Sequence, residues 1–173
     1  MKSYEVIDNF LEPNRFKELQ NLIIYSNQFT WSIRNTVSHD PSNENFRSEI
    51  EDELWSWYGI HMLYRLVPQS QYFDFIYSMF HDKLEVKSLT RVKVNFHPYT
   101  HEVKERPQHF DYPHKHKAAV FSLNTCDGFT RMSNGDKIGS VENRIVLFDA
   151  SEMHNSSTTS NQKGRYNINF NYF

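Results

Sequence analysis

The sequence has little of what disulfide-rich, membrane-spanning and secreted proteins need. Its 173 residues include one cysteine, Cys126, which excludes an internal disulfide and a cysteine-rich zinc site. No stretch approaches the roughly 18 consecutive apolar residues of a transmembrane helix, and the N-terminus lacks the apolar run of a signal peptide. We therefore expect a soluble, cytoplasmic protein with no membrane partner.

The sequence also lacks an excess of charge of either sign, and it has few Gly and Pro residues. Lys and Arg total 19 against 21 Asp and Glu, which leaves no basic excess of the kind typical of nucleic-acid binders. With only 5 Gly, 6 Pro and no repeat or linker, residues 1–173 predict a single domain. Aromatic residues are abundant instead, at 16% of the chain, and their apolar area excludes a fully disordered protein.

The first half of the chain, residues 1–88, predicts an N-terminal helical portion. A short strand over 4–10 precedes a helix that opens at Pro13, and a second amphipathic pattern runs from Tyr72 to Leu84. The polar residues 35–49 predict a loop, which is either a lid or a surface excursion. The aromatic stretch 51–66 shows no clean period, so its structure stays open. Its Trp55, Trp57 and Tyr58 favour core packing over a base-stacking platform.

From residue 89 onward the pattern changes to short strands separated by turn residues. Alternation predicts a strand at 91–96, and a hairpin is predicted around Asn134-Gly135. Further strands are expected at 118–123, 144–148 and 165–170. Together these elements predict an α+β fold, with a double-stranded β-helix (jelly-roll) core over 89–173 and the N-terminal helices packed on one sheet.

Three residues in the β-rich half could hold a metal. His109 and Asp111 stand two apart, so on an extended segment their side chains share a face. His154, just beyond the strand at 144–148, is available as a third ligand. Two His and one carboxylate, with other positions open, suit the Fe(II) of non-haem oxygenases. Eleven residues later Arg165 opens the last strand, where its guanidinium can pair with a carboxylate.

This order of residues resembles the 2-oxoglutarate- and Fe(II)-dependent oxygenases. Within that family the sequence is most similar to short prolyl-4-hydroxylase-like members, including those encoded by bacteriophages. The matching segments are YEVIDNFLEP, RVKVNFHPYT, GFTRMSNGDKIGSVENRIVLFD and GRYNINFNYF. Residues 30–88 contribute little to the likeness, which rests on the C-terminal half.

The resemblance implies a role for each matching residue. His109, Asp111 and His154 would bind Fe(II), and Arg165 would hold the distal carboxylate of 2-oxoglutarate. Asn95, His97 and Tyr99 compete for a further cosubstrate contact, of which we select Asn95 and Tyr99. Another contact that some members make with a tyrosine is missing, because this chain has Ser122 there.

The resemblance also implies an activity. Fe(II), 2-oxoglutarate and O2, with ascorbate as an accessory, would hydroxylate an unactivated C–H bond and release succinate and CO2. Relatives that halogenate replace the carboxylate ligand with a small residue, so Asp111 favours hydroxylation. A peptide or protein, with proline as the target residue, is the expected substrate. The protein would act as a monomer or weak homo-oligomer, in a host cytoplasm if a phage encodes it.

Two other functions and two other motifs stay open at this point. The chain could be a nucleic-acid demethylase of the same superfamily or a non-catalytic metal-binding jelly-roll module. His114-Lys115-His116 has the H-x-H spacing of cupins without the residues expected downstream, so we expect a solvated loop. Arg91 and Lys93 either line the pocket mouth, where they would meet an acidic substrate, or form an ordinary polar strand face.

Overall fold

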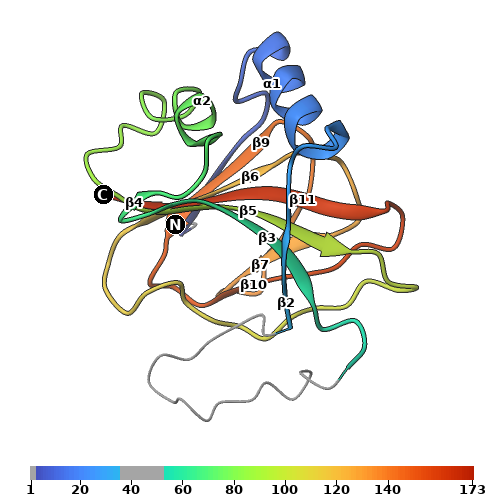
Figure 1. Ribbon diagram of the computed structural model, residues 1–173. Helices are drawn as coiled ribbons and strands as arrows, with labels where there is room; N and C mark the ends of the chain where they lie inside the picture. The colour runs from blue at the N-terminus through green and yellow to red at the C-terminus, as the bar shows by residue number, and fades with distance from the viewer. Residues whose placement is uncertain (1–2, 36–52) are drawn as a thin grey trace.

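An eight-stranded antiparallel sheet forms the centre of the protein (Figure 1). The computed structural model describes residues 3–35 and 53–173, so the predicted loop at 35–49 lies almost wholly outside the described residues. The strand order is β1-β9-β6-β11-β5-β3-β2, with β4 paired to β3. The strands are β1 (Tyr4–Ile7), β2 (Ser32–Arg34), β3 (Tyr58–Arg65), β4 (Val67–Pro68), β5 (Leu89–Pro98), β6 (Lys117–Ser122), β9 (Arg144–Asp149) and β11 (Gly164–Tyr172).

A second, three-stranded sheet lies beneath the first in the view of Figure 1. Its order is β10-β7-β8, from the strands β10 (His154–Ser156), β7 (Phe129–Met132) and β8 (Lys137–Gly139). The predicted hairpin is confirmed, because β7 pairs with β8 and Gly135 in the turn has φ 89°. A positive φ of this size favours glycine, which lacks the Cβ that would clash.

The helices cover the face of the large sheet that points away from the small one (Figure 1). They are α1 (Pro13–Gln20), a π-helical turn η1 (Asn21–Tyr25) that continues it, and α2 (Phe73–Tyr77). Their apolar side chains join those of the sheet in one buried cluster, which includes Phe16, Leu19, Ile76, Phe121 and Phe170. The prediction that the N-terminal helices pack on one sheet is confirmed.

The predicted α+β class and the helical character of residues 1–88 need correction, because the protein is mostly β. Four strands, β1 to β4, belong to the first 68 residues and all join the large sheet. The stretch 51–66 had no clean period because β3 lies inside the sheet and buries residues on both of its faces. The amphipathic pattern of 72–84 forms only five residues of helix, and the turns that follow bury Met79, Phe80 and Leu84 in the same cluster. No helix in the described ranges is long and apolar enough to cross a membrane.

Candidate metal centre

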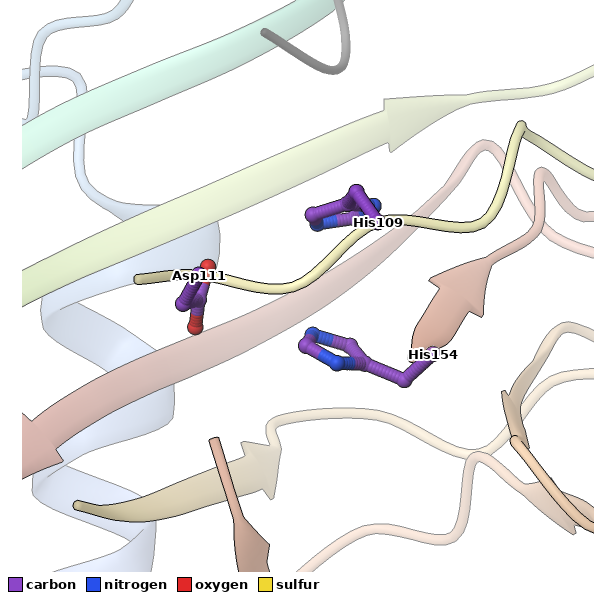
Figure 2. Close-up of side chains that lie close together, drawn as sticks. All are labelled: His109, Asp111 and His154. Atoms are coloured by element: carbon purple, nitrogen blue, oxygen red, sulfur yellow. The ribbon is translucent and has the colours of Figure 1, made fainter. Parts of the chain in front are cut away.

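His109, Asp111 and His154 come together between the two sheets (Figure 2). Their ligand atoms, one from each side chain, all lie within 4.8 Å of one another. No other group of three His, Cys, Asp or Glu side chains in residues 3–35 and 53–173 gathers in this way. The structure therefore brings together the three ligands that the sequence spacing predicts.

The backbone fixes the two histidines side by side. The His109 amide donates to the His154 carbonyl at 2.9 Å, and the His154 amide donates to the His109 carbonyl at 2.9 Å. This isolated antiparallel bridge holds the two rings with their centroids 4.8 Å apart. This pairing fixes the backbone of both ligands before a metal binds, so little conformational freedom is lost on binding.

Carbonyl groups orient both imidazole rings. Nδ1 of His154 lies 2.9 Å from the carbonyl oxygen of Glu152, and Nδ1 of His109 lies 3.4 Å from that of Pro107. With its Nδ1–H donated to a carbonyl, a neutral ring keeps its Nε2 lone pair for a metal. Burial lowers the pKa of His109 to about 4, with the His154 ring acting in the same direction. His109 is therefore neutral near pH 7, as a metal ligand has to be.

Arg91 sets the charge state of the third ligand. Its Nη2 donates to Oδ1 of Asp111 at 2.6 Å, and the Asp111 side chain is only 5% exposed. Burial alone would raise the pKa of the Asp111 carboxyl, but the positive charges of Arg91 and Lys93 outweigh burial and lower that pKa far below its usual range. Asp111 is thus ionised, with its Oδ2 in only one long contact, at 3.4 Å, from Asn169.

The three ligands open into a cavity between the sheets whose walls are mostly polar. Arg165, near the start of β11, also lines this cavity and is 1% exposed. It stands four residues along the strand from Asn169, which contacts Asp111, so it lies at the end of the cavity away from that ligand. The other lining residues are Tyr58, Lys93, Asn95, His97, Val120, Thr130, Asn155, Ser156, Asn167 and Asn169. Val120 is the one aliphatic side chain among them, so the cavity suits a polar ligand.

Arg165 has a buried N–H donor without a partner. Its Nη2 donates to Oγ1 of Thr130 at 2.8 Å and its Nη1 to the carbonyl of Ser157 at 3.4 Å, while Nε has no partner. No carboxylate among the described residues pairs with it. Gly128 makes room for the side chain, because a Cβ at that position would lie 2.7 Å from Cδ of Arg165 and 2.6 Å from the Thr158 carbonyl oxygen.

The unpaired N–H donor of Arg165 fits the dicarboxylate that the resemblance implies. Besides Nε of Arg165, buried atoms without a partner in this cavity are Nδ1 of His97 and two amide oxygens, Oδ1 of Asn95 and Oδ1 of Asn155, which accept rather than donate. A buried polar atom without a hydrogen bond is costly, so a cluster of them at one cavity end indicates a ligand site. Burial lowers the pKa of Arg165 to about 10, which leaves its guanidinium positive at neutral pH. Arg165 could pair with a carboxylate of 2-oxoglutarate in the cavity where His109, Asp111 and His154 could hold Fe(II).

Of the two residues selected as further cosubstrate contacts, one lines the cavity and the other does not. Asn95 lines the cavity, where its Nδ2 donates to Oδ1 of Asn167 at 2.8 Å. Tyr99 does not, because its side chain is 52% exposed and lies at a separate surface depression beside Lys163. Strand β5 ends at Pro98, so the alternation that would aim Tyr99 inward stops one residue too early. His97, which competed for this role, faces the cavity instead.

The structure also shows the positions of His116, of Arg91 and Lys93, and of Tyr58. His116 is buried rather than solvated, and its Nε2 lies 2.7 Å from Oδ1 of Asn171, so it is a structural histidine outside the metal-ligand group. Lys93 lines the cavity and Arg91 binds Asp111, so this is no ordinary polar strand face. Tyr58, which sequence reasoning missed as a site residue, stacks on His97 with ring centroids 6.0 Å apart.

Comparisons with known proteins agree on the architecture. No family model and no curated protein matches the chain, but solved structures do. A Trichoplax adhaerens prolyl hydroxylase, in complex with a hypoxia inducible factor peptide fragment, aligns with a TM-score of 0.65 and 17% identity over 99% of this chain and 83% of its own. The viral collagen prolyl hydroxylase of Paramecium Bursaria Chlorella virus-1 gives 0.60 and 13% over 98% and 94%. A 2OG-Fe(II) oxygenase family protein of Burkholderia pseudomallei gives 0.64 and 8% over 98% and 84%.

The chain has the 2-oxoglutarate/Fe(II) oxygenase fold. At these identities the likeness establishes the fold, and a fold hosts more than one chemistry. The functional argument for this oxygenase fold therefore rests on its own cavity, with His109, Asp111 and His154 at one end and Arg165 at the other.

Proposed function

We propose that the protein is an Fe(II)- and 2-oxoglutarate-dependent dioxygenase that hydroxylates an unactivated C–H bond and releases succinate and CO2. The observation that carries the proposal is the convergence of His109, Asp111 and His154 in a cavity that also contains Arg165, whose Nε has no partner. Two His and one carboxylate leave several metal positions open, which suits a cosubstrate and O2 better than a structural role.

Each residue has a defined task in this proposal. Nε2 of His109, Nε2 of His154 and one carboxylate oxygen of Asp111 would hold the metal, and Arg165 would pair with the distal carboxylate of 2-oxoglutarate. Bound Fe(II), with 2-oxoglutarate and O2, supplies the oxidant that attacks the C–H bond. The protein would contribute position, since the three ligands and Arg165 would orient the cosubstrate in a cavity that shields it from bulk water.

A peptide with a prolyl residue is the substrate that we propose. Its support is the likeness in fold to prolyl hydroxylases, one of which was solved with a peptide fragment. The demethylase alternative has less support, because the formal charge of −2 offers no excess of basic residues for a phosphate backbone. We further propose that residues 1–173 work as one catalytic domain, since β1 and β11, from the two ends of the chain, lie in the same sheet.

Uncoupled turnover tests the proposal without a known substrate. Purified protein with Fe(II), 2-oxoglutarate and ascorbate in air should form succinate above the protein-free background. His109→Ala should lose this activity, and the matched control His114→Ala, an exposed histidine nearby, should keep it. Wild-type protein with no succinate above background would contradict the proposal and leave a non-catalytic module.

Two additions separate the candidate substrates. Prolyl peptides should gain 16 Da, the mass of one oxygen atom, in the wild-type reaction. A methylated oligonucleotide should release no formaldehyde. Formaldehyde release with unmodified peptides would instead favour the demethylase.

A further inference from the structure

Lys93 is a charged group in the cavity whose ammonium has no direct partner among the described residues. It lies in the middle of β5 and lines the cavity, yet it has no hydrogen bond and no ion pair with any described residue. Its one specific neighbour is the ring of Tyr58, whose centroid lies 5.9 Å from Nζ. Burial and the positive charge of Arg91 together lower the pKa of Lys93 to about 8, although the Asp111 carboxylate acts in the opposite direction, so the ammonium is still charged near pH 7.

The proposed function, on which this inference rests, does not use that charge. Arg91 is engaged with Asp111 at 2.6 Å, and Arg165 is assigned to 2-oxoglutarate. A divalent metal and a dianionic cosubstrate cancel each other. Asp111 is the only acidic side chain among the cavity-lining residues. The ammonium of Lys93 therefore has no counter-charge once metal and cosubstrate are bound.

A second cation lies close to the same tyrosine. Arg106 is 2% exposed, and its guanidinium carbon lies 5.8 Å from the centroid of Tyr58. Nη2 donates to the carbonyl of Trp57 at 2.6 Å, while Nε and Nη1 have no partner. Tyr58 thus lies near two under-satisfied cations, and the local field at this wall is positive.

The strand register excludes Lys93 from the cosubstrate end. Lys93 pairs across β5 and β11 with Asn169, which contacts Asp111, whereas His97 pairs with Arg165. Four residues of extended strand separate Lys93 from His97, which is about 13 Å at the usual rise per residue. The ammonium therefore lies at the metal end of the cavity, on the side where a substrate has to place its reacting bond.

We propose that the substrate carries a carboxylate close to its reacting C–H bond, and that Lys93 binds this carboxylate. An Asp or Glu side chain flanking the target residue of a peptide, or the carboxylate of a free small acid, would supply the same chemistry. An ion pair in a partly buried cavity both attracts the substrate and fixes its orientation. Lys93 is then a specificity-determining residue for the proposed reaction.

Equilibrium dialysis tests this binding apart from turnover. The protein is loaded with 2-oxoglutarate and with Zn(II), a metal that does not support the oxidation. Three peptide pools with a degenerate central position are offered, with flanks of Asp and Glu, of Asn and Gln, or of Lys and Arg. A further arm offers free amino acids and their α-amides. Mass spectrometry counts what each chamber retains, including 2-oxoglutarate.

We expect wild-type protein to retain the acidic pool, or the free acids, about tenfold better than their amides. Lys93→Met should remove this preference, and Lys93→Arg should keep it to within about threefold. The control Lys87→Met, at an exposed lysine outside the cavity, should behave as wild type. Which arm shows the preference identifies the source of the carboxylate.

Three results would overturn the inference. One is equal retention of acidic and amide probes by the wild type, and another is a preference that survives Lys93→Met in folded protein. The third is a loss of 2-oxoglutarate retention by more than about tenfold in Lys93→Met, which would assign the lysine to the cosubstrate. Failure of the proposed function is separate, because wild-type protein would then retain no 2-oxoglutarate.

Discussion

The two faces of β11 serve different purposes: the residues on one face pack in the core, and those on the other line the cavity. Ile168 and Phe170 are fully buried against the helices, in the large apolar cluster. Arg165 and Asn169, on the opposite face, are also buried but line the cavity. Burial alone therefore does not distinguish a core residue from a site residue, and the difference lies in whether the polar atoms of a side chain find partners.

The largest effect should come from removing a ligand on the cavity side. His154→Ala leaves His109 and Asp111 without the third donor, so we expect metal affinity to fall by more than about a hundredfold. The metal-free protein should also lose some stability, because the buried His154 ring packs on Phe148 with centroids 4.8 Å apart, so the affinity is compared on folded protein. A Co(II) titration followed by visible absorbance measures this, and metal affinity like that of wild type would show that the three residues are not a ligand set.

The opposite result should follow on the helix side. Phe170→Ala removes a fully buried ring that packs on Phe80 with centroids 4.7 Å apart. We expect the free energy of unfolding to fall by about 3–5 kcal/mol, with the Co(II) affinity of the folded protein unchanged. Urea unfolding measures the first and the titration the second. Equal losses of stability and of metal affinity would break the distinction between the two faces.

A smaller and more selective effect is expected at Gly128. An added Cβ would press on Cδ of Arg165 and on a backbone carbonyl, so Gly128→Ala should displace the guanidinium. We expect the affinity for 2-oxoglutarate to fall about tenfold with metal affinity unchanged. Gly139→Ala is the matched control, because a Cβ there meets nothing within 4 Å. Weaker metal binding in Gly128→Ala would mean that the two cavity ends are not independent.

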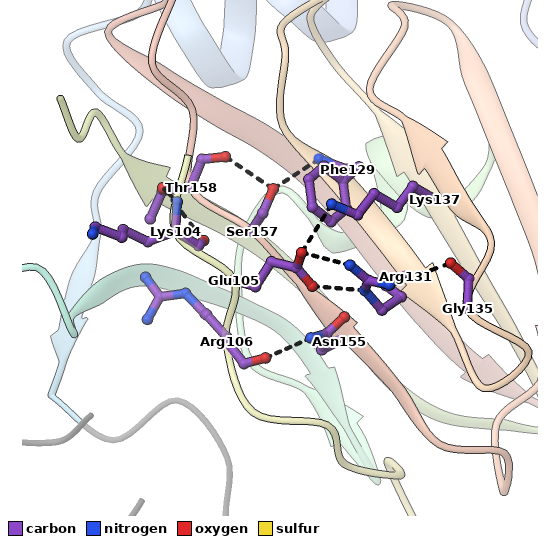
Figure 3. A network of polar contacts seen from close by, with 10 residues as sticks. All are labelled: Lys104, Glu105, Arg106, Phe129, Arg131, Gly135, Lys137, Asn155, Ser157 and Thr158. Carbon is purple, nitrogen blue, oxygen red and sulfur yellow. Dashed lines mark hydrogen bonds and ion pairs between the residues drawn. The ribbon is translucent and has the colours of Figure 1, made fainter. Parts of the chain in front are cut away.

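The smallest effect concerns an ion-pair network outside the cavity (Figure 3). Arg131 and Lys137 hydrogen-bond to Glu105 at 2.7 and 2.9 Å, and despite some burial they lower the pKa of its carboxyl to about 2. A carboxyl whose pKa is lower in the folded state stabilises the protein above its unfolded pKa of about 4.3. That contribution is lost as the pH falls from there towards 2.

Acid unfolding measures the contribution of this network. Glu105→Gln should give a shallower loss of stability across that pH interval than wild type, with unchanged metal affinity at neutral pH. Because Glu105 is partly exposed, the difference is expected to be modest and to shrink further in high salt. An identical acid profile for both proteins would contradict the assignment of the pKa to this network.

The sequence predicted the metal ligands because they follow simple local rules. The H-x-D spacing places His109 and Asp111 on one face, and the strand before His154 predicts its position. Alternation along β11 likewise predicts that Arg165, Asn167 and Asn169 share a face. These features depend on one segment at a time, and the structure brings all six residues to the same cavity.

Other features depend on contacts between distant segments, and the sequence could not show them. Tyr58 reaches the cavity only because β3 pairs with β5, and the irregular burial of β3 hid this strand. Tyr99, which was selected as a cosubstrate contact, does not line the cavity, and the end of β5 at Pro98 that explains this was not apparent from the sequence. The partnership of Arg91 with Asp111 joins two segments 20 residues apart.

The most direct test of the account is an anaerobic titration of 2-oxoglutarate into Fe(II)-loaded protein. A keto acid that chelates Fe(II) gives a weak visible charge-transfer band. We predict the band in wild type, its loss in His154→Ala, and a weaker titration in Arg165→Ala with the final band intact. Wild-type protein that binds Fe(II) and shows no band at saturating 2-oxoglutarate would contradict the assignment of this cavity to an oxygenase.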